Sequence, residues 1–224
     1  MAKRAFDVVA SAAVLAILMP VMAVIAMMIW AGSPRSDVIF RGRRVGRFSR
    51  PFMLFKFRTM VQDASKIGPA VTAGDDPRVT RLGRFLRKTK LDELPSLWNV
   101  IRGDMSLVGP RPENEKSFAL YTPPQRAVVK VRPGITSLAT LRYRNEEELL
   151  AGAADLEAAY HELMQEKLRI ELEYLKRQTL WSDFEVLLYT LWAIVNPGAS
   201  EKLFARFGID ARKPYSSRTA ASNN

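Results

Sequence analysis

The chain has 224 residues, of which 48% are hydrophobic and 25% carry a charge, so it can bury a core and is too apolar for a disordered polymer. It has no cysteine and one histidine, which excludes disulfides, thiolate metal sites, a cysteine nucleophile and sites built from several histidines. The formal net charge of +11 predicts an acidic partner, which can be nucleic acid, anionic lipid headgroups or a phosphorylated small molecule.

An uncharged apolar segment, residues 8–30, follows the N-terminus. A straight helix over this segment would reach roughly 35 Å, which matches the hydrocarbon core of a bilayer. The segment is longer than the apolar part of a secretory signal, and it runs into Trp30, a residue type that anchors helices at membrane interfaces. We therefore expect it to remain attached to the mature protein.

Proline and flanking charge both affect how this segment meets a membrane. Pro20 removes a helix hydrogen bond, which predicts a kink or break near Met19–Pro20. Positive charge flanks both ends, and cytoplasmic flanks collect such charge, so a helix that enters, bends and returns is favoured over a kinked single span. The flanking residues are Lys3, Arg4, Arg35, Arg41, Arg43, Arg44 and Arg47.

The stretch after the apolar segment predicts a β-hairpin. Its strands are Val38–Arg41 and Phe52–Thr59, and the connection between them contains glycine and proline. Two-residue periodicity places Lys56 and Arg58 on one face of the second strand and Phe57 on the other. The strand should therefore have a partly cationic face and an apolar face.

A polar loop and two helices are predicted next. The loop covers residues 61–78, and a basic amphipathic helix follows at Val79–Lys90, where it suits either solvent or anionic lipid headgroups. A short helix is predicted to begin near Asp92, to tolerate Pro95 in its first turn and to end at Gly103.

The C-terminal part predicts mostly helix. A proline-glycine loop at 131–137 precedes a charge-rich helical region, 146–178, in which His161 should lie on a solvated face. A further helix, Ser182–Val195, opens with a capping box and carries an apolar stripe that suits either a core or a membrane interface. The tail from Arg212 is predicted to be disordered.

The acidic pair Asp92-Glu93 is the strongest candidate for chemistry. Such pairs are common helix caps, but here arginine and lysine surround the pair, so the carboxylates should stay ionised and phosphates should gather beside them. A carboxylate in that setting can attack phosphorus or hold Mg²⁺, and a helix N-terminus offers N–H groups to a phosphate. The surrounding basic residues are Arg78, Arg81, Arg84, Arg87, Lys88, Lys90, Arg102 and Arg111.

The block DELPSLWNVIRGDMSLVGPRPE, residues 92–113, resembles the signature of the bacterial sugar transferases, which are monotopic phosphoglycosyl transferases. Six further blocks agree, and together they span residues 3–192: KRAFDVVASAAVLAILMP, IFRGRRVGR, FKFRTM, DPRVTRLGRFLRKTKLDELP, VRPGIT and YLKRQTLWSDFEVLLYT.

This resemblance implies an α+β fold that is mostly α, with a re-entrant membrane helix broken at Pro20, interfacial amphipathic helices and a small soluble unit with a β-hairpin. The implied domains are a membrane helix over 1–34, a catalytic domain over 35–211 and a flexible tail over 212–224. The implied location is the bacterial inner membrane, with the catalytic part facing the cytoplasm.

The resemblance also implies the reaction, which would be the first membrane step of exopolysaccharide or other glycoconjugate synthesis. The donor would be a UDP-sugar, the acceptor undecaprenyl phosphate and the cofactor Mg²⁺, with membrane phospholipid around the protein, no nucleic acid partner and a homodimer left open. The family's nucleophile falls on Asp92, which would attack the β-phosphorus, expel UMP, carry the sugar phosphate and lie near the metal. Glu93 would assist the metal or act as a base for the lipid phosphate.

Several basic and polar residues are candidate phosphate or nucleotide contacts. Lys56, Arg58 and Arg111 are the first three candidates. Surface solvation or loop support is an equally good explanation for four others, which are Arg87, Glu113, Arg132 and Thr136.

The sequence departs from the family pattern at four positions. Met19 stands where the family usually has a serine, and a methionine side chain cannot cap the backbone groups that a helix break leaves free. The other departures are Ser137, Thr140 and Glu171. A membrane-held nucleic-acid-binding protein, the first rival function, does not explain the acidic pair or the rigid proline-glycine loops. A non-catalytic scaffold, the second rival, would tolerate decay of the carboxylate pair, and the pair is intact.

Overall fold

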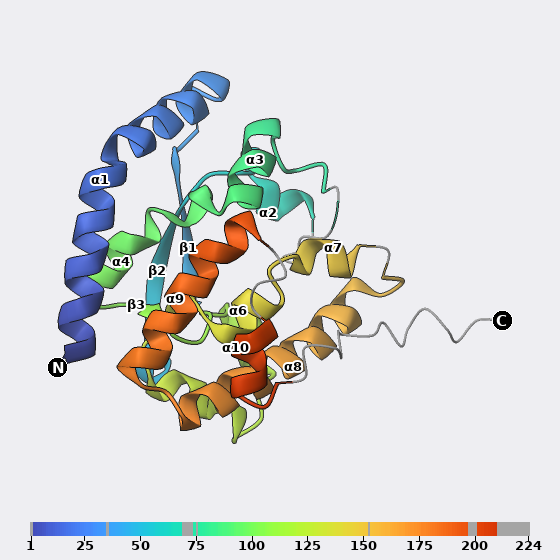
Figure 1. Cartoon of the computed structure of the whole chain (residues 1–224). Coiled ribbons are helices and arrows are strands. Elements are labelled where there is room, and N and C mark those ends of the chain that lie inside the picture. Colours follow the sequence, from blue (N-terminus) through green and yellow to red (C-terminus); the bar gives the residue numbers. More distant parts are fainter. Residues whose placement is uncertain are drawn as a thin grey trace. The chain divides into compact units, whose positions relative to one another are not determined.

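The computed structural model describes residues 2–34, 36–68, 74, 76–151, 153–196 and 201–209, so the predicted tail over 212–224 lies outside the described residues. The chain is mostly helical with two small two-stranded sheets, as an α+β fold that is mostly α requires (Figure 1). It divides into two compact units, of which the first combines Met1–Gln62 with Arg78–Ile135 and the second combines Asp63–Pro77 with Thr136–Asn224.

The first unit contains the long N-terminal helix and most of the strands. Its helices and strands are α1 (Ala2–Gly32), β1 (Ile39–Val45), β2 (Pro51–Phe57), α3 (Arg81–Thr89), α4 (Ser96–Arg102), β3 (Ser106–Val108), α5 (Glu115–Ala119) and β4 (Gly134–Thr136), which ends at the unit boundary. Three 3-10 turns lie between them: η1 (Arg47–Ser49), η2 (Leu91–Glu93) and η3 (Gln125–Lys130).

Helix α1 is long and apolar enough to cross a membrane by length and composition. It is helical throughout Ala2–Gly32 with Pro20 inside, so the predicted break is not seen, although Figure 1 shows the helix changing direction along its length. A proline removes one hydrogen bond from a helix, and a bend can accommodate that loss without ending the helix. Large apolar side chains on α1 are exposed, among them Ile17 (74%) and Met19 (64%).

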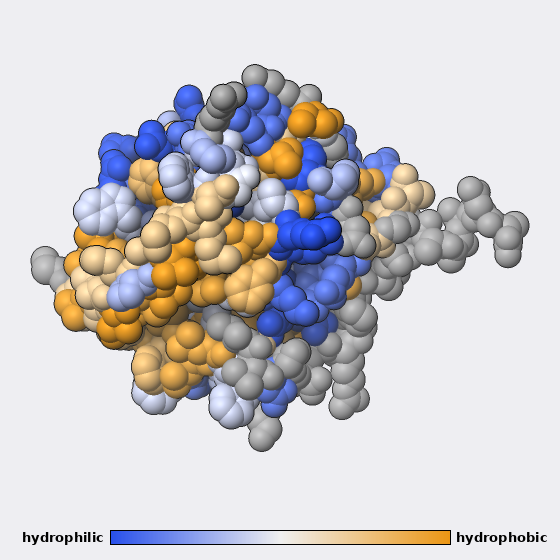
Figure 2. Space-filling view, turned by 90° about the horizontal axis from the view of Figure 1, so that it is seen from above, coloured by the Kyte–Doolittle hydropathy of each residue, from blue (hydrophilic) through white to orange (hydrophobic). Residues whose placement is uncertain are grey.

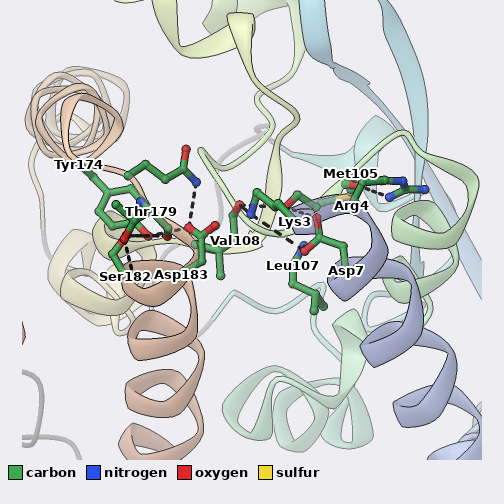
Figure 3. Close-up of polar contacts among 12 residues, drawn as sticks. Lys3, Arg4, Asp7, Met105, Leu107, Val108, Tyr174, Thr179, Ser182 and Asp183 are labelled. Carbon is green, nitrogen blue, oxygen red and sulfur yellow. Dashed lines mark hydrogen bonds and ion pairs between the residues drawn. The ribbon is translucent and has the colours of Figure 1, made fainter. Parts of the chain in front are cut away.

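The N-terminal end of α1 is bonded to the rest of the first unit. Asp7, which is only 2% exposed, accepts hydrogen bonds from the Ser106 hydroxyl (2.8 Å) and the Leu107 N–H (3.3 Å) of β3. Lys3 donates to the Val108 carbonyl (3.2 Å), and Arg4 donates to the Met105 carbonyl (3.4 Å) (Figure 3). Arg4 also donates to the Ile101 carbonyl (3.0 Å) at the end of α4. We call these contacts the α1 anchor.

The C-terminal half of α1 packs against the same unit through apolar contacts. Ile25 and Ile29 form a buried cluster with Phe57 of β2 and Leu86 of α3. Both ends of α1 are therefore attached to one compact body, the first by hydrogen bonds and the second by hydrophobic packing.

Strands β1 and β2 pair antiparallel, with a register that runs from Ile39 opposite Phe57 to Val45 opposite Pro51. The pair is longer on the β1 side than the predicted Val38–Arg41, because residues up to Val45 join the ladder. Leu54 and Phe57 lie on opposite faces of β2 and both are buried, and Lys56, on the face of Leu54, is paired with Glu93. One face of β2 meets η2 and the other packs against α1 and α3.

The second unit is helical in its described part. It contains α2 (Ala64–Ile67), α6 (Leu138–Arg142), α7 (Glu146–Leu150), α8 (Leu156–Lys176), α9 (Leu180–Val195) and α10 (Glu201–Arg206). The predicted loop over 61–78 therefore contains a short helix, and the charge-rich region over 146–178 is two helices. His161 is exposed on α8, as predicted.

Helix α9 begins earlier than the sequence predicts. Its N-cap is Thr179, and the capping box joins Thr179 to Ser182, whose side chain and backbone bond to the cap reciprocally. Asp183 accepts a hydrogen bond from the buried Tyr174 hydroxyl (2.7 Å), which fixes the start of α9 against the end of α8 (Figure 3).

The predicted apolar stripe of α9 is largely exposed where the structure describes its side chains. Of the predicted stripe, Phe184, Leu188, Leu191 and Trp192 are exposed and Leu187 is half-buried, and Leu180 and Trp181 before it are exposed as well. Figure 2 shows apolar side chains gathered in continuous areas of the surface beside strongly hydrophilic ones. Contiguous exposed apolar surface of this kind indicates contact with a membrane or another protein.

Candidate active site

The acidic pair lies on a tight turn between two helices. Helix α3 ends at Lys90, whose φ of 60° is left-handed, and the chain then forms the 3-10 turn η2 that carries Asp92 and Glu93. Pro95 is the N-cap of α4, and Gly103 ends α4 with a φ of 99°. The predicted end at Gly103 is confirmed, but the acidic pair precedes the α-helix rather than forming its first turn, so the helix N-terminus argument does not hold.

The Asp92 side chain is buried and incompletely hydrogen-bonded. The residue is 7% exposed, and its Oδ1 atom has no hydrogen-bond partner among the described residues. Burial raises the pKa of Asp92, and the neighbouring Glu93 carboxylate raises it further, although Lys56, Lys90 and Arg111 act in the opposite direction. Burial therefore outweighs the cations in the direction of this pKa shift, and the expectation of an ionised Asp92 stays a prediction.

The Glu93 side chain has the opposite environment. Its Oε1 atom accepts hydrogen bonds from Lys56 Nζ (2.7 Å) and from an Arg111 guanidinium nitrogen (2.6 Å), and a second Arg111 nitrogen is 3.4 Å from Oε2. Burial acts to raise the pKa of Glu93, but the charges of Arg111 and Lys56 and their hydrogen bonds hold it well below the ordinary value. The expectation of an ionised carboxylate therefore holds for Glu93.

Lys56 completes a charged cluster drawn from three separate parts of the sequence. It comes from β2, Glu93 comes from η2, and Arg111 comes from the GPRP loop after β3. Burial lowers the pKa of Lys56, and Glu93 opposes that effect most strongly. We call Asp92, Glu93, Lys56 and Arg111 the acidic-pair site. All four are predicted site residues, the acidic pair for chemistry and the two cations as phosphate or nucleotide contacts, and the fold places both cations against Glu93.

A residue that sequence reasoning missed supports this site. Asn99 of α4 is fully buried, accepts a hydrogen bond from the Phe55 N–H (3.0 Å) and donates one to the Met53 carbonyl (2.7 Å). Its amide side chain thus pairs with the backbone of β2 immediately before Lys56. The only sign of this role in the sequence is an asparagine in the middle of a short apolar helix. A buried amide needs hydrogen-bond partners, so such a residue indicates a bonded position.

The other candidate contacts have separate partners. Arg58 lies 3.9 Å from Asp37, and one of its guanidinium nitrogens is buried without a hydrogen-bond partner among the described residues. Arg87 donates to the Thr59 hydroxyl (2.9 Å), and Arg132 donates to the Gly103 carbonyl (2.9 Å). In the second unit, the Thr136 hydroxyl is 2.9 Å from that of Thr190.

Glu113 lies beside Arg111 on the wall of a pocket in the first unit. Its backbone carbonyl accepts a hydrogen bond from the Val45 N–H (2.9 Å), which ties the GPRP loop to the end of β1. Arg111 belongs both to this pocket wall and to the acidic-pair site, so Glu113 lies close to that site. Arg132 lies near Arg4 and Arg47 instead.

The acidic-pair site fits a divalent metal only in part. Within the described residues, no group of three or more histidine, cysteine or acidic side chains is placed to hold a metal ion. Proteins commonly bind Mg²⁺ through one or two carboxylates together with substrate phosphates, and the buried, unpartnered Oδ1 of Asp92 suits one such ligand position. Any Mg²⁺ here would therefore depend on oxygens of a bound diphosphate.

Comparison with known proteins identifies the family. The family model described as bacterial sugar transferase matches residues 1–197. The UDP-glucose:undecaprenyl-phosphate glucose-1-phosphate transferase of Caulobacter vibrioides is 38% identical over 195 residues, which are 84% of this chain and 68% of that protein. The Escherichia coli protein of the same name is 36% identical over 203 residues, covering 88% of this chain and 41% of the relative.

A third relative carries the name of a different sugar. The undecaprenyl-phosphate galactose phosphotransferase of Salmonella typhimurium is 33% identical over 205 residues, which are 84% of this chain and 39% of that protein. This chain thus spans less than half of the Escherichia coli and Salmonella relatives. The family match over residues 1–197, together with the Caulobacter relative, establishes that the chain belongs to the bacterial sugar transferase family.

Proposed function

We propose that the chain is a phosphoglycosyl transferase that moves a sugar-1-phosphate from a UDP-sugar to undecaprenyl phosphate and releases UMP. The observation that carries the proposal is a buried aspartate with an unpartnered oxygen, Asp92, beside a glutamate that is paired with a lysine and an arginine. The names of the relatives, which act on undecaprenyl phosphate, support the acceptor, and UDP-glucose in two of those names supports the donor class.

The proposed reaction has two displacements at one phosphorus. A carboxylate oxygen of Asp92 attacks the β-phosphorus of the donor, and the bond to the oxygen that bridges to the α-phosphate breaks, with the electron pair leaving on UMP. An oxygen of the lipid phosphate then attacks the same phosphorus, which restores the Asp92 carboxylate. Burial of Asp92 supports this scheme, because an aspartyl phosphate needs protection from water.

The neighbouring cations support binding of the diphosphate. Lys56 and Arg111 carry two positive charges, which balance Glu93 and an ionised Asp92 and lie where they can also contact phosphate oxygens. The low pKa of Glu93 makes this residue a weak base and favours a role in holding Lys56, Arg111 and the metal in place. Mg²⁺, when bound at Asp92, would add positive charge that favours the ionised carboxylate.

We propose a re-entrant topology in which both ends of α1 lie on the cytoplasmic side of the bacterial inner membrane. The α1 anchor and the buried cluster of Ile25 and Ile29 attach the two ends to the same compact unit, which supports this topology over a span. Positive flanks favour the cytoplasmic side, and the exposed apolar face of α9 supports contact with phospholipid.

The decisive experiment is UMP release by the purified protein with undecaprenyl phosphate and a panel of UDP-sugars. The relatives name glucose and galactose, so UDP-glucose and UDP-galactose come first, and the preferred sugar identifies the glycan whose first membrane step this would be. Asp92→Asn should lower UMP release by more than 100-fold with every sugar. Asp37→Asn, which changes an 87% exposed carboxylate, is the matched control and should retain activity. An Asp92→Asn protein with more than a few per cent of activity would refute the nucleophile assignment.

A further inference from the structure

A pocket in the first unit has no role in the reaction as described so far. It is a small hollow that is partly open to solvent. Its wall is mainly apolar, and Arg111 and Glu113 are its charged residues. The other lining residues are Val45, Gly46, Pro110, Pro112, Phe118, Tyr121, Val128, Val129, Val131 and Pro133.

Two aromatic rings form a braced part of this wall. The Phe118 and Tyr121 rings lie 5.1 Å apart at 56°. The Arg126 guanidinium lies 5.6 Å from the Phe118 ring centre, and its Nε donates to the Tyr121 carbonyl (3.3 Å). Because both rings are held by neighbours, they offer a preformed surface to a flat ligand.

The backbone around the pocket is also fixed. The Val45 N–H donates to the Glu113 carbonyl (2.9 Å), and the Gly134 N–H donates to the Pro110 carbonyl (2.9 Å). A Cβ atom at Gly109 would come within 2.5 Å of the Arg132 carbonyl, so the loop can pack this closely only with glycine there. The pocket wall is therefore built from segments that are bonded to one another, which reduces the ordering cost of binding.

Arg111 connects the pocket to the acidic-pair site. It lines the pocket, and the same guanidinium donates to Glu93 at 2.6 Å. A phosphate bound at Arg111 would thus have the reacting phosphorus on the Glu93 side and its other substituent on the pocket side. In a nucleoside diphosphate sugar, the substituent beyond the α-phosphate is the nucleoside.

We propose that this pocket holds the pyrimidine nucleoside of the sugar donor, with the base against Phe118 and Tyr121. The inference rests on the proposed function for its ligand and adds the part of the donor that leaves with UMP. A nucleoside suits a small pocket with two aromatic rings, a cation for its phosphate and a carboxylate that can accept from ribose hydroxyl groups. The lipid acceptor offers a phosphate to Arg111 but no hydroxyl group that could donate to Glu113.

The test compares UMP with ribose 5-phosphate, which has the same phosphate and sugar but no base. Binding is measured by calorimetry on the whole detergent-solubilised protein, both wild type and Asp92→Asn, so that turnover is not needed. Wild type should bind UMP at least about tenfold more tightly than ribose 5-phosphate. Phe118→Ala should weaken UMP binding about tenfold and leave ribose 5-phosphate binding within twofold.

Two further variants make the test independent of one substitution. Val129→Phe, at a partly exposed position, should fill the pocket and produce the same selective loss of UMP binding. This variant tests the pocket if Phe118→Ala does not fold. Phe40→Ala, at a 47% exposed ring outside the pocket, is the control and should change neither affinity.

Three results would overturn the proposal. They are no preference for UMP in wild type, an equal loss of both ligands in the pocket variants, and pocket variants that raise the KM for undecaprenyl phosphate while UMP binds normally. Base-dependent UMP binding without any sugar-phosphate adduct would uphold the pocket and refute the proposed function. A sugar-phosphate adduct together with UMP binding that Phe118→Ala and Val129→Phe do not affect would uphold the proposed function and refute the pocket.

Discussion

Asp92 and Glu93 are adjacent in sequence, yet their environments shift the two pKa values in opposite directions. Asp92 is buried with an unpartnered oxygen, whereas Glu93 is buried between Lys56 and Arg111. Pairs of titratable groups with diverging pKa values commonly divide roles in active sites. In the proposed reaction, this division corresponds to attack by Asp92 and charge positioning by Glu93.

Glu171 offers a separate residue-scale prediction, in the second unit. Burial raises its pKa to about 7, against opposing effects of Ser137, Lys167 and the Ala139 backbone, and its Oε2 has no partner among the described residues. A folded-state pKa above the unfolded value means that the folded state binds the proton more tightly. The resulting stabilisation is complete below about pH 4.5 and is lost as the pH rises through 7.

Glu171→Gln should remove this pH dependence, because the amide cannot ionise. The thermal unfolding midpoint of wild type should fall relative to that of the variant between pH 5 and pH 8, by an amount equivalent to at most about 3 kcal/mol. Glu173→Gln, at a partly exposed acidic residue two positions later, should follow the wild-type profile over this pH range. Parallel profiles for wild type and Glu171→Gln would mean that Glu171 ionises normally in the fold.

At the residue scale, the sequence indicated which residues are candidates for the site, but not how buried they are or how their pKa values shift. Lys56 and Arg111 were predicted as phosphate contacts, and both now lie against Glu93. The raised pKa of Asp92 was not predictable, because charges can be counted along a sequence while burial depends on the packed fold. Asn99 was missed for the same reason, since its role comes from an edge of β2 more than forty residues earlier in the chain.

At the scale of elements, the α1 anchor joins a membrane-type helix to the strand that precedes the GPRP loop. Asp7→Ala would leave the Leu107 N–H buried without its acceptor, and the Ser106 hydroxyl would keep only the Val108 carbonyl (3.0 Å). We expect a loss of stability of about 1–3 kcal/mol, measured as a lower unfolding midpoint in detergent. Asp37→Ala, at an exposed carboxylate of the same unit, is the control. Equal midpoints for Asp7→Ala and wild type would show that the anchor does not stabilise the fold.

Helical regions were predictable from periodicity, while their ends were decided by side-chain hydrogen bonds and by packing. Helix α9 starts after Thr179 because Thr179 and Ser182 cap each other. The sequence also offers a capping box at Ser182 and Glu185, and the prediction used that one. The acidic pair lies on a 3-10 turn because Lys90 adopts a left-handed conformation and ends α3 just before it. Pro20 remains inside α1, where apolar contacts of Ile25 and Ile29 favour continuation of the helix.

At the scale of the whole molecule, attachment of both ends of α1 to one unit predicts the topology. In a cysteine-free background, Ala2→Cys and Arg50→Cys should both react with an impermeant maleimide in inverted membrane vesicles and not in intact spheroplasts. Met19→Cys, at a 64% exposed apolar position within α1, should react in neither preparation, since lipid would surround it. Labelling of Ala2→Cys from outside spheroplasts would mean that α1 spans the membrane.

The mostly helical α+β fold and the family could be predicted from the sequence, because long apolar patterns and a dense motif block carry that information. The division into two units could not, since it depends on α1 packing with residues up to Ile135. The exposed apolar stripe of α9 was compatible with both a core and an interface until the fold showed which side chains are covered.

The most direct test of the account is to trap the sugar-phosphate adduct on Asp92. Wild-type protein is incubated with Mg²⁺ and radiolabelled UDP-sugar without the lipid acceptor, quenched, digested and analysed by mass spectrometry. We predict one labelled peptide, with the added mass of a sugar phosphate on Asp92, and loss of the label when undecaprenyl phosphate is supplied before quenching. Turnover by the same preparation with no adduct at Asp92, or with the label on another residue, would contradict the account.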